Sequence, residues 1–182
     1  VLRPGCFTGT TSNALIEQNW LPPLVRAAVR GETYTVYGYE GKQVRSLLHA
    51  DDLARAVLGC VDASGVSRDG STPPRSSRFV FDQAHEVPLP GRDGWRWSGE
   101  VFNVDGGPAA AVSILEAVDL IAKITGRRGN LTFAEKRPGD WPWFVGSYRK
   151  IDEALGWRPD IGLRQIIEEV CADEMARVEV AA

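Results

Sequence analysis

The chain has 182 residues, 43% of them hydrophobic, which is ordinary for one globular domain with a buried core. Its formal net charge of -3 argues against a nucleic-acid-binding protein, because affinity for the phosphate backbone depends on a concentrated positive surface. No apolar run approaches the roughly 20 residues of a membrane helix, no signal peptide is evident, and the 3 cysteines lack metal-binding spacing, so we expect a cytoplasmic protein without a membrane partner.

The first elements are a short strand and a helix. Residues 1–3 are predicted to end a strand, and Pro4-Gly5 to turn the chain. Residues 21–30 combine apolar positions with two prolines in the first turn and a glycine just after the last residue, which predicts a helix.

The next stretch brings strand, turn and helix signals together around Arg45. Residues 33–37 alternate β-branched and aromatic side chains and predict a strand, which glycines at 38 and 41 end; residues 43–49 predict a second strand. Asp51 or Asp52 is expected to cap the helix that follows. The apolar face expected for that helix consists of Leu53, Ala56, Val57, Cys60 and Val61.

Arg45 thus lies on an ordered strand beside a glycine turn. A guanidinium held on a rigid element is oriented in advance to bind a carboxylate or a phosphate through two parallel hydrogen bonds. The alternative is a surface arginine paired with a nearby acid.

The rest of the chain predicts more alternating elements and one interruption. Residues 64–99 are rich in Pro, Ser and Gly and are interpreted as a mobile surface insertion, which Trp95 and Trp97 would anchor to the body. Ser113 and Glu116 form a capping-box pattern at the start of a helix. The remaining expected elements are strands at 101–104 and 131–135 and helices at 114–124, 148–155 and from 163 onward.

Three motifs occur together in one order. They are Gln43-Val44-Arg45 followed by Asp51-Asp52-Leu53, then Phe102-Asn103-Val104-Asp105-Gly106-Gly107, then Arg137-Pro138-Gly139-Asp140. This order resembles the substrate-binding part of the extended short-chain dehydrogenase/reductase family, the NAD-dependent nucleotide-sugar epimerases and dehydratases. The resemblance implies an α/β fold, the C-terminal portion of a Rossmann-type protein with a small mixed sheet, forming a single nucleotide-sugar-binding domain over residues 1–182.

The resemblance also implies roles for individual residues. Arg45 and Arg137 would bind the diphosphate of a nucleotide sugar, and Asn103 would lie at the substrate. Two guanidiniums are tolerated face to face mainly where a dianion binds, so we expect Arg45 and Arg137 to converge on one pocket, with Asn103 and Asn19 near its rim. For Asn103 the alternative is a turn residue that bonds to its own backbone.

Cys6, Asn19 and Trp20 resemble a smaller group, the CDP-tyvelose (CDP-paratose) 2-epimerases. In that group a cysteine stands in the loop next to the nicotinamide ring, and an acidic-Gln-Gly-Trp passage precedes the helix. Asn19 and Trp20 are therefore expected to contact phosphate, base or sugar. The alternatives are a small buried thiol for Cys6, a helix cap for Asn19 and a core side chain for Trp20.

The redox half of such an enzyme has no counterpart among these residues. The sequence has no G-x-G-x-x-G loop after a strand, and none of its 4 tyrosines has a lysine four residues on. We expect no catalytic residue and no metal site here, and NAD, the cofactor of the full-length family, not to bind this chain alone. An N-terminal Rossmann half would have to be supplied on the same or another chain, and a homo-oligomer is an open possibility. The competing interpretation is a non-catalytic nucleotide-sugar-binding or assembly module.

Overall fold

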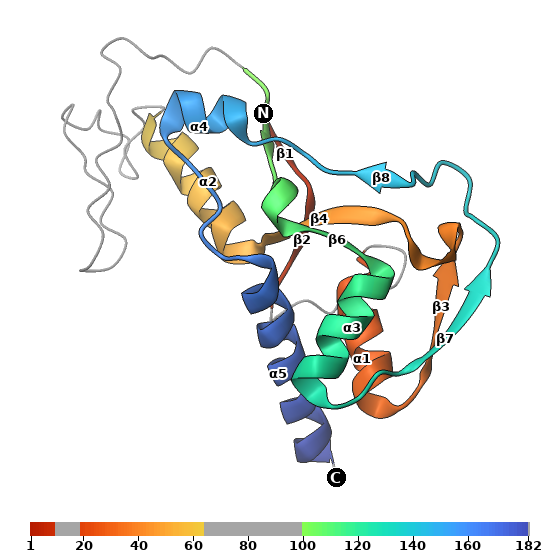
Figure 1. Ribbon diagram of the computed structural model, residues 1–182. Helices are drawn as coiled ribbons and strands as arrows, with labels where there is room; N and C mark the ends of the chain where they lie inside the picture. The colour runs from red at the N-terminus through yellow and green to blue at the C-terminus, as the bar shows by residue number, and fades with distance from the viewer. Residues whose placement is uncertain (10–18, 64–99, 182) are drawn as a thin grey trace.

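A computed structural model describes residues 1–9, 19–63 and 100–181 (Figure 1). The expected insertion at 64–99, including Trp95 and Trp97, lies outside the described residues. The helices are α1 (Leu21–Arg30), α2 (Ala50–Ala63), α3 (Ile114–Thr125), α4 (Arg149–Leu155) and α5 (Leu163–Ala181), with short 3-10 turns η1 (Tyr39–Gly41) and η2 (Pro108–Ala110). The strands are β1 (Leu2–Pro4), β2 (Cys6–Thr8), β3 (Thr33–Tyr37), β4 (Val44–His49), β5 (Phe102–Val104), β6 (Ala111–Ser113), β7 (Asn130–Ala134) and β8 (Trp143–Phe144).

The strands form small sheets of mixed direction. β1 pairs with β5 and β3 pairs with β7, both in parallel. β4 has three partners: β2 and β8 run parallel to it, and β6 runs antiparallel. The predicted α/β fold with a small mixed sheet is therefore confirmed.

Strand β4 separates two hydrophobic cores. Its neighbouring residues Leu47 and Leu48 are both fully buried, and they belong to different clusters because successive side chains of a strand point to opposite faces. The Leu47 side packs against α1, α3 and α5, which contact one another, and the Leu48 side packs against α2 and α4 (Figure 1). A shift of β4 by one residue would move each of its side chains to the opposite face. Burial of Leu47 and Leu48 therefore also fixes the face on which Arg45 lies.

Local sequence patterns correctly predicted both ends of α1 and the start of α3. Helix α1 begins and ends as predicted, and Gly31 closes it in the left-handed conformation. The Ser113 hydroxyl accepts the Glu116 N–H, and the Glu116 carboxylate accepts the Ser113 N–H at 2.8 Å, so the predicted capping box is present.

Two strand predictions were incomplete. β1 ends at Pro4, but the predicted turn is absent: Gly5 N–H donates to the Val104 carbonyl at 2.9 Å, and β2 begins at the next residue. Strands β6 and β8 were not predicted at all. They have three and two residues, which is too short for an alternation of polar and apolar side chains to be recognised.

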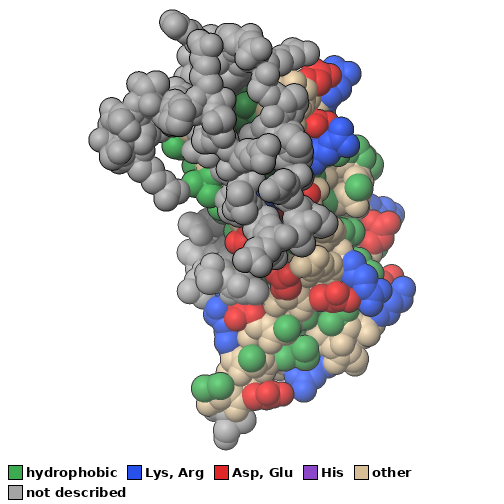
Figure 2. All heavy atoms as spheres, turned by 90° about the vertical axis from the view of Figure 1, so that its left-hand side faces the viewer, with side chains coloured by type: hydrophobic (Ala, Val, Ile, Leu, Met, Phe, Trp, Pro, Cys, Tyr) green, Lys and Arg blue, Asp and Glu red, His purple; other side chains and the backbone are tan. Residues whose placement is uncertain are grey.

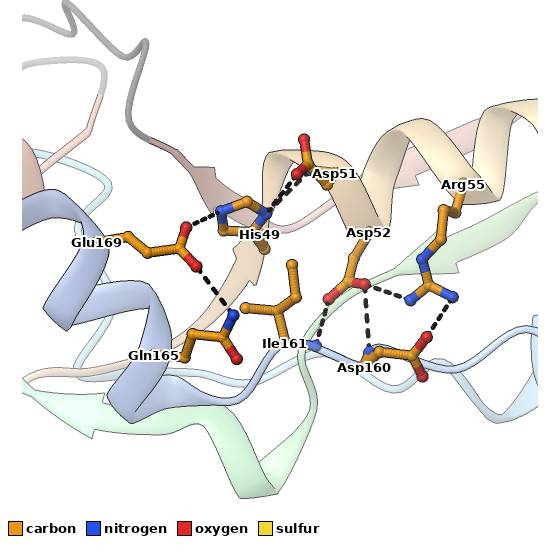
Figure 3. Close-up of polar contacts among 8 residues, drawn as sticks. All are labelled: His49, Asp51, Asp52, Arg55, Asp160, Ile161, Gln165 and Glu169. Carbon is orange, nitrogen blue, oxygen red and sulfur yellow. Dashed lines mark hydrogen bonds and ion pairs between the residues drawn. The ribbon is translucent and has the colours of Figure 1, made fainter. Parts of the chain in front are cut away.

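The start of α2 differs from the prediction. His49 Nδ1 accepts the free Asp51 N–H at 3.1 Å, while the buried Asp52 carboxylate accepts N–H groups from Asp160 at 3.2 Å and Ile161 at 3.0 Å (Figure 3). The predicted cap was therefore wrong, because Asp52 binds the segment before α5 instead. The predicted apolar face was partly wrong too, since Val57 and Val61 are 45% and 40% exposed.

His49 connects the end of β4 to α5. Because its Nδ1 accepts a backbone N–H, its Nε2 carries the proton and donates to Glu169 Oε2 at 2.9 Å (Figure 3). Gln165, one turn earlier on α5, donates to the other oxygen of Glu169 at 2.9 Å. These contacts hold α5 against the strand that carries Arg45.

The described surface carries both signs of charge. In Figure 2 acidic and basic side chains are interspersed over the described residues of that face, without one large patch of a single sign. The described residues of that face therefore form no concentrated positive area, which agrees with the slightly negative net charge.

Candidate functional site

Arg45 is held in one orientation by a turn that is distant in sequence. Its Nη2 donates to Asp140 Oδ1 at 2.9 Å and to the Trp141 carbonyl at 2.8 Å, and its Nη1 donates to the Val44 carbonyl at 2.8 Å. An arginine has five N–H groups, so Nε–H and one Nη1–H have no hydrogen-bond partner within the described part of the chain. The side chains of Arg45 and Asp140 are only 18% and 19% exposed.

The turn that holds Arg45 also carries Arg137. Asp140 N–H donates to the Arg137 carbonyl at 3.2 Å, which closes the turn, and Tyr39 Oη–H donates to the Asp140 carbonyl at 2.8 Å. The Arg137 guanidinium carbon lies 4.9 Å from the centre of the Tyr37 ring, a cation–π contact on an otherwise exposed side chain. The two arginines that we expected at the diphosphate are thus connected through the turn 137–140.

Backbone geometry brings this turn to β4. Gly38 has a positive φ of 70°, and a Cβ at this position would meet Lys136, so the chain between β3 and β4 can pass close to residue 136 only with glycine here. On the other side, β8 places Phe144 opposite Arg45. The turn is therefore fixed at both of its ends.

Cys6, Asn19 and Trp20 form a second group on the same side of β4. Cys6 lies opposite Leu47 in the β2–β4 ladder, two residues beyond Arg45. Burial raises the pKa of the Cys6 thiol to about 11, and the negative charge of Asp105 adds to this, while the Trp20 indole and the Arg45 charge oppose it. The thiol is therefore protonated at neutral pH and is a poor nucleophile.

Asn19 uses most of its hydrogen-bonding groups within the chain, and one Nδ2–H has no partner among the described residues. Its Nδ2 donates to the Phe7 carbonyl at 2.8 Å, and its Oδ1 accepts the Leu21 N–H at 3.3 Å and lies 3.8 Å from the Cys6 thiol. This geometry favours the helix-cap alternative. Trp20 is different, because its buried Nε1 makes no well-formed hydrogen bond among the described residues and only lies close enough to the Cys6 thiol to lower its pKa.

Asn103 lies apart from this group. It is an exposed residue on β5, opposite Arg3 of β1, and no hydrogen bond found in the described part of the chain joins it to Arg45 or Arg137. The structure therefore brings Arg45, the turn of Arg137, Cys6 and Trp20 to one strand, and does not bring Asn103 there.

Sequence reasoning missed the residues that position the arginines. Tyr37, Tyr39 and Gln43 surround the turn, and Asp140 orients Arg45. Asp140 stands in the motif that we used for Arg137, so a signal for it was present. Gln43 likewise stands in the motif of Arg45, whereas Tyr37 and Tyr39 are ordinary strand and turn residues whose partners lie about 100 residues further along the chain.

The glycine loop after β5 does not fit the pyrophosphate of NAD. A Cβ at Gly106 would clash with the Leu47 carbonyl oxygen, so this glycine allows two backbone segments to pack closely. The loop leads into η2 and β6 and not into a helix N-terminus, which is the element that binds a pyrophosphate. This loop is therefore not assigned a role in binding NAD.

A metal-binding cluster and a membrane-spanning helix are both absent from the described residues. These residues contain no cluster of three or more His, Cys, Asp or Glu side chains arranged to hold a metal ion. None of their helices is both long enough and apolar enough to cross a membrane.

Similar proteins were found by sequence. No protein-family model matches the chain. UDP-glucose 4-epimerase 1 of Oryza sativa subsp. japonica is 27% identical over 164 residues, which is 87% of this chain and 37% of that protein. UDP-glucose 4-epimerase of Rhizobium meliloti is 26% identical over 158 residues, covering 84% and 39%.

Solved structures agree with these matches. UDP-glucose 4-epimerase of Thermotoga maritima, determined with UDP-glucose, superposes with a TM-score of 0.64 at 21% identity, covering 98% of this chain and 46% of that one. The fold is that of the Rossmann-type epimerases. MoeE5 in complex with UDP-glucuronic acid and NAD gives a TM-score of 0.68 at 24% identity, covering 98% and 46%.

The matches are partial in length. The chain spans about two fifths of the curated relatives and just under half of the solved structures named above. Both curated relatives named above and the Thermotoga maritima structure are UDP-glucose 4-epimerases, similar at low identity over most of this chain. A CDP-sugar epimerase is not among these matches.

Proposed function

We propose that this chain is the nucleotide-sugar-binding portion of an NAD-dependent nucleotide-sugar epimerase or dehydratase, in which Arg45 and Arg137 bind the diphosphate. The observation that carries the proposal is the turn 137–140, which contacts Arg45 through Asp140 and carries Arg137 itself. The similarity to UDP-sugar epimerases supports the substrate class.

The electrostatics of the turn suit a dianion. Asp140 neutralises only one of the two guanidiniums, so a net positive charge remains for a diphosphate. Arg45 keeps Nε–H and one Nη1–H for phosphate oxygens, in an orientation that Asp140 has already fixed. Arg137 lies on an aromatic ring and has no carboxylate partner among the described residues, so within that part of the chain it can turn to a phosphate without breaking an ion pair.

Other residues have supporting roles in this proposal. Trp20 would contact the sugar of the ligand from the Cys6 side of Arg45, because its indole lies close to the Cys6 thiol. Cys6 would stand next to the nicotinamide as a small protonated thiol. Asn19 acts indirectly, by holding the start of α1, and Asn103 would reach the substrate only from the neighbouring sheet.

Catalysis requires more than these residues. NAD binding and the Tyr-x-x-x-Lys acid-base pair would come from a Rossmann unit on the same or another chain. We therefore propose that the 182 residues alone bind the nucleotide sugar and neither retain NAD nor convert the sugar. Uracil and cytosine are the two candidate bases. The curated relatives named above are UDP-glucose 4-epimerases, whereas Cys6 is the feature that resembles the CDP-sugar 2-epimerases.

A thermal-shift panel tests the proposal. UDP-glucose, CDP-glucose, UDP, glucose 1-phosphate and NAD are added singly to the purified chain. A ligand present at about 100 times its Kd should stabilise the fold by about 2.7 kcal/mol. We expect a rise in Tm with UDP-glucose or CDP-glucose and none with NAD, and a flat response to every nucleotide sugar would refute the proposal.

A reconstitution experiment with the same chain distinguishes the non-catalytic interpretation from the enzymatic one. Adding a Rossmann unit that carries the glycine loop and Tyr-x-x-x-Lys should produce sugar epimerisation or dehydration if the enzymatic interpretation is right. Unchanged sugar after such reconstitution, with nucleotide-sugar binding intact, would leave a binding module.

A further inference from the structure

Gln43 has a buried oxygen that lacks a hydrogen-bond partner. The side chain is 6% exposed, and its Nε2 donates to the Tyr37 carbonyl at 3.2 Å. Because a backbone carbonyl can only accept, this bond fixes which end of the amide is nitrogen. Oε1 is then a buried acceptor without a donor among the described residues, an uncommon state for a polar atom inside a protein.

The position of Gln43 relates it to Arg45. It immediately precedes β4, two residues before Arg45, so an extended backbone places both side chains on the same face. Leu47, two residues after Arg45, lies opposite Cys6. At a rise of about 3.3 Å per residue, Gln43 and the Cys6 end of the strand lie about 7 Å to either side of Arg45.

The order of these side chains along β4 predicts how a bound nucleotide sugar is oriented. If Arg45 binds the diphosphate, one side of it must hold the sugar and the other side the nucleoside. Cys6 and Trp20 lie on one side, and Gln43, Tyr37 and the Arg137 guanidinium over the Tyr37 ring lie on the other.

We infer that Gln43 Oε1 accepts a hydrogen bond from the nucleoside of the bound nucleotide sugar, and so helps to select the nucleotide. The inference rests on the proposed function, since it takes the diphosphate to lie at Arg45. The donor is a ribose hydroxyl or an N–H of the pyrimidine base; phosphate oxygens carry no proton at neutral pH and cannot supply it. Gln43 is a binding residue in this account and takes no part in proton or hydride transfer.

The test compares ligands that each lack one donor. Isothermal titration calorimetry gives the Kd of the full 182-residue chain for UDP-glucose and for its 2′-deoxy, 3′-deoxy and N3-methyl analogues, with CDP-glucose measured in parallel. We expect one analogue to bind about three- to tenfold more weakly than UDP-glucose, the loss typical of one uncharged hydrogen bond. The two deoxy analogues report on the ribose, and the N3-methyl analogue reports on the base.

Substitution then assigns the effect to Gln43. Gln43→Met keeps the length of the side chain and removes its acceptor, so it should bind UDP-glucose about three- to tenfold more weakly and no longer discriminate against the weaker analogue. Gln165→Met is the matched control: Gln165 is exposed on α5 and contacts Glu169, and its loss should leave both Kd values unchanged.

The outcomes separate this inference from the proposed function. If the parent chain binds no nucleotide sugar, the proposed function fails and the inference fails with it. If the parent binds but tolerates all three analogues equally, or if Gln43→Met discriminates as the parent does, the inference alone is wrong. The comparison of analogues needs only the parent chain, so equal affinities would overturn the inference even if Gln43→Met does not fold.

Discussion

Asp52 provides the sharpest test of how the strand of Arg45 is held in the fold. Its carboxylate is fully buried, and it accepts from the Arg55 guanidinium, from Asp160 N–H and from Ile161 N–H (Figure 3). The Asp52 backbone carbonyl accepts the Trp157 indole N–H at 3.1 Å. One residue therefore joins the start of α2 to the segment that leads into α5.

Replacing Asp52 by asparagine should destabilise the protein by about 3 kcal/mol. The variant keeps the size of the side chain, but one of its two ends becomes an NH₂ group that faces a backbone N–H. The protein loses a charge-assisted hydrogen bond, worth about 1.5 to 3 kcal/mol, and leaves buried donors facing each other, at a cost of about 1 to 3 kcal/mol. For a chain of this size the loss corresponds to a decrease in Tm of about 6 to 12 °C.

Urea unfolding of Asp52→Asn, with Asp51→Asn as the control, measures the effect. The neighbouring Asp51 side chain is 81% exposed, so its replacement should change the free energy of unfolding by no more than about 0.5 kcal/mol. We expect a lower midpoint for Asp52→Asn at an unchanged m value. A loss below about 1 kcal/mol, or equal losses for the two variants, would refute the account of Asp52 given above.

Two further predictions concern single side chains. Hydrogen bonds from the Ser113 backbone N–H and then its hydroxyl lower the pKa of Glu116, so its stabilising contribution is present above the unfolded pKa and is lost as the pH falls through the folded one. The parent should therefore lose more stability than Glu116→Gln between about pH 6 and about pH 3, and parallel urea curves would contradict this. With a pKa raised to about 11 by burial, Cys6 should react with iodoacetamide in the native protein at about pH 8 far more slowly than in the unfolded chain, and equal rates by mass spectrometry would count against its protonated state.

Features carried by neighbouring residues could be predicted from the sequence. The helix 21–30, its closing glycine and the capping box of Ser113 and Glu116 depend on groups within four residues of one another, and all three are present. The α/β class was implied by the resemblance that rests on the three motifs. Such signals need no knowledge of the tertiary structure.

Features that depend on distant partners could not be predicted. Asp52 was read as a helix cap because its partners, Asp160 and Ile161, lie more than 100 residues away. The Arg45–Asp140 pair spans 95 residues, and only the motif resemblance suggested that these segments meet. The hydrogen bonds of Asn19 to Phe7 and Leu21 likewise depend on the folded arrangement of the loop before α1, and its role as a substrate contact stays a prediction.

The central claim is that Arg45 and Arg137 together bind a diphosphate. The most direct test is to measure the Kd of UDP-glucose and of CDP-glucose for four proteins: the parent, Arg45→Ala, Arg137→Ala and the double variant. Each charge-assisted contact is worth about 1.5 to 3 kcal/mol, so each single variant should bind about ten- to a hundredfold more weakly. Arg149→Ala serves as the control, because this exposed arginine contacts Glu153 on α4 and should leave the Kd unchanged. A double variant that binds both nucleotide sugars as tightly as the parent would contradict the assignment of the site.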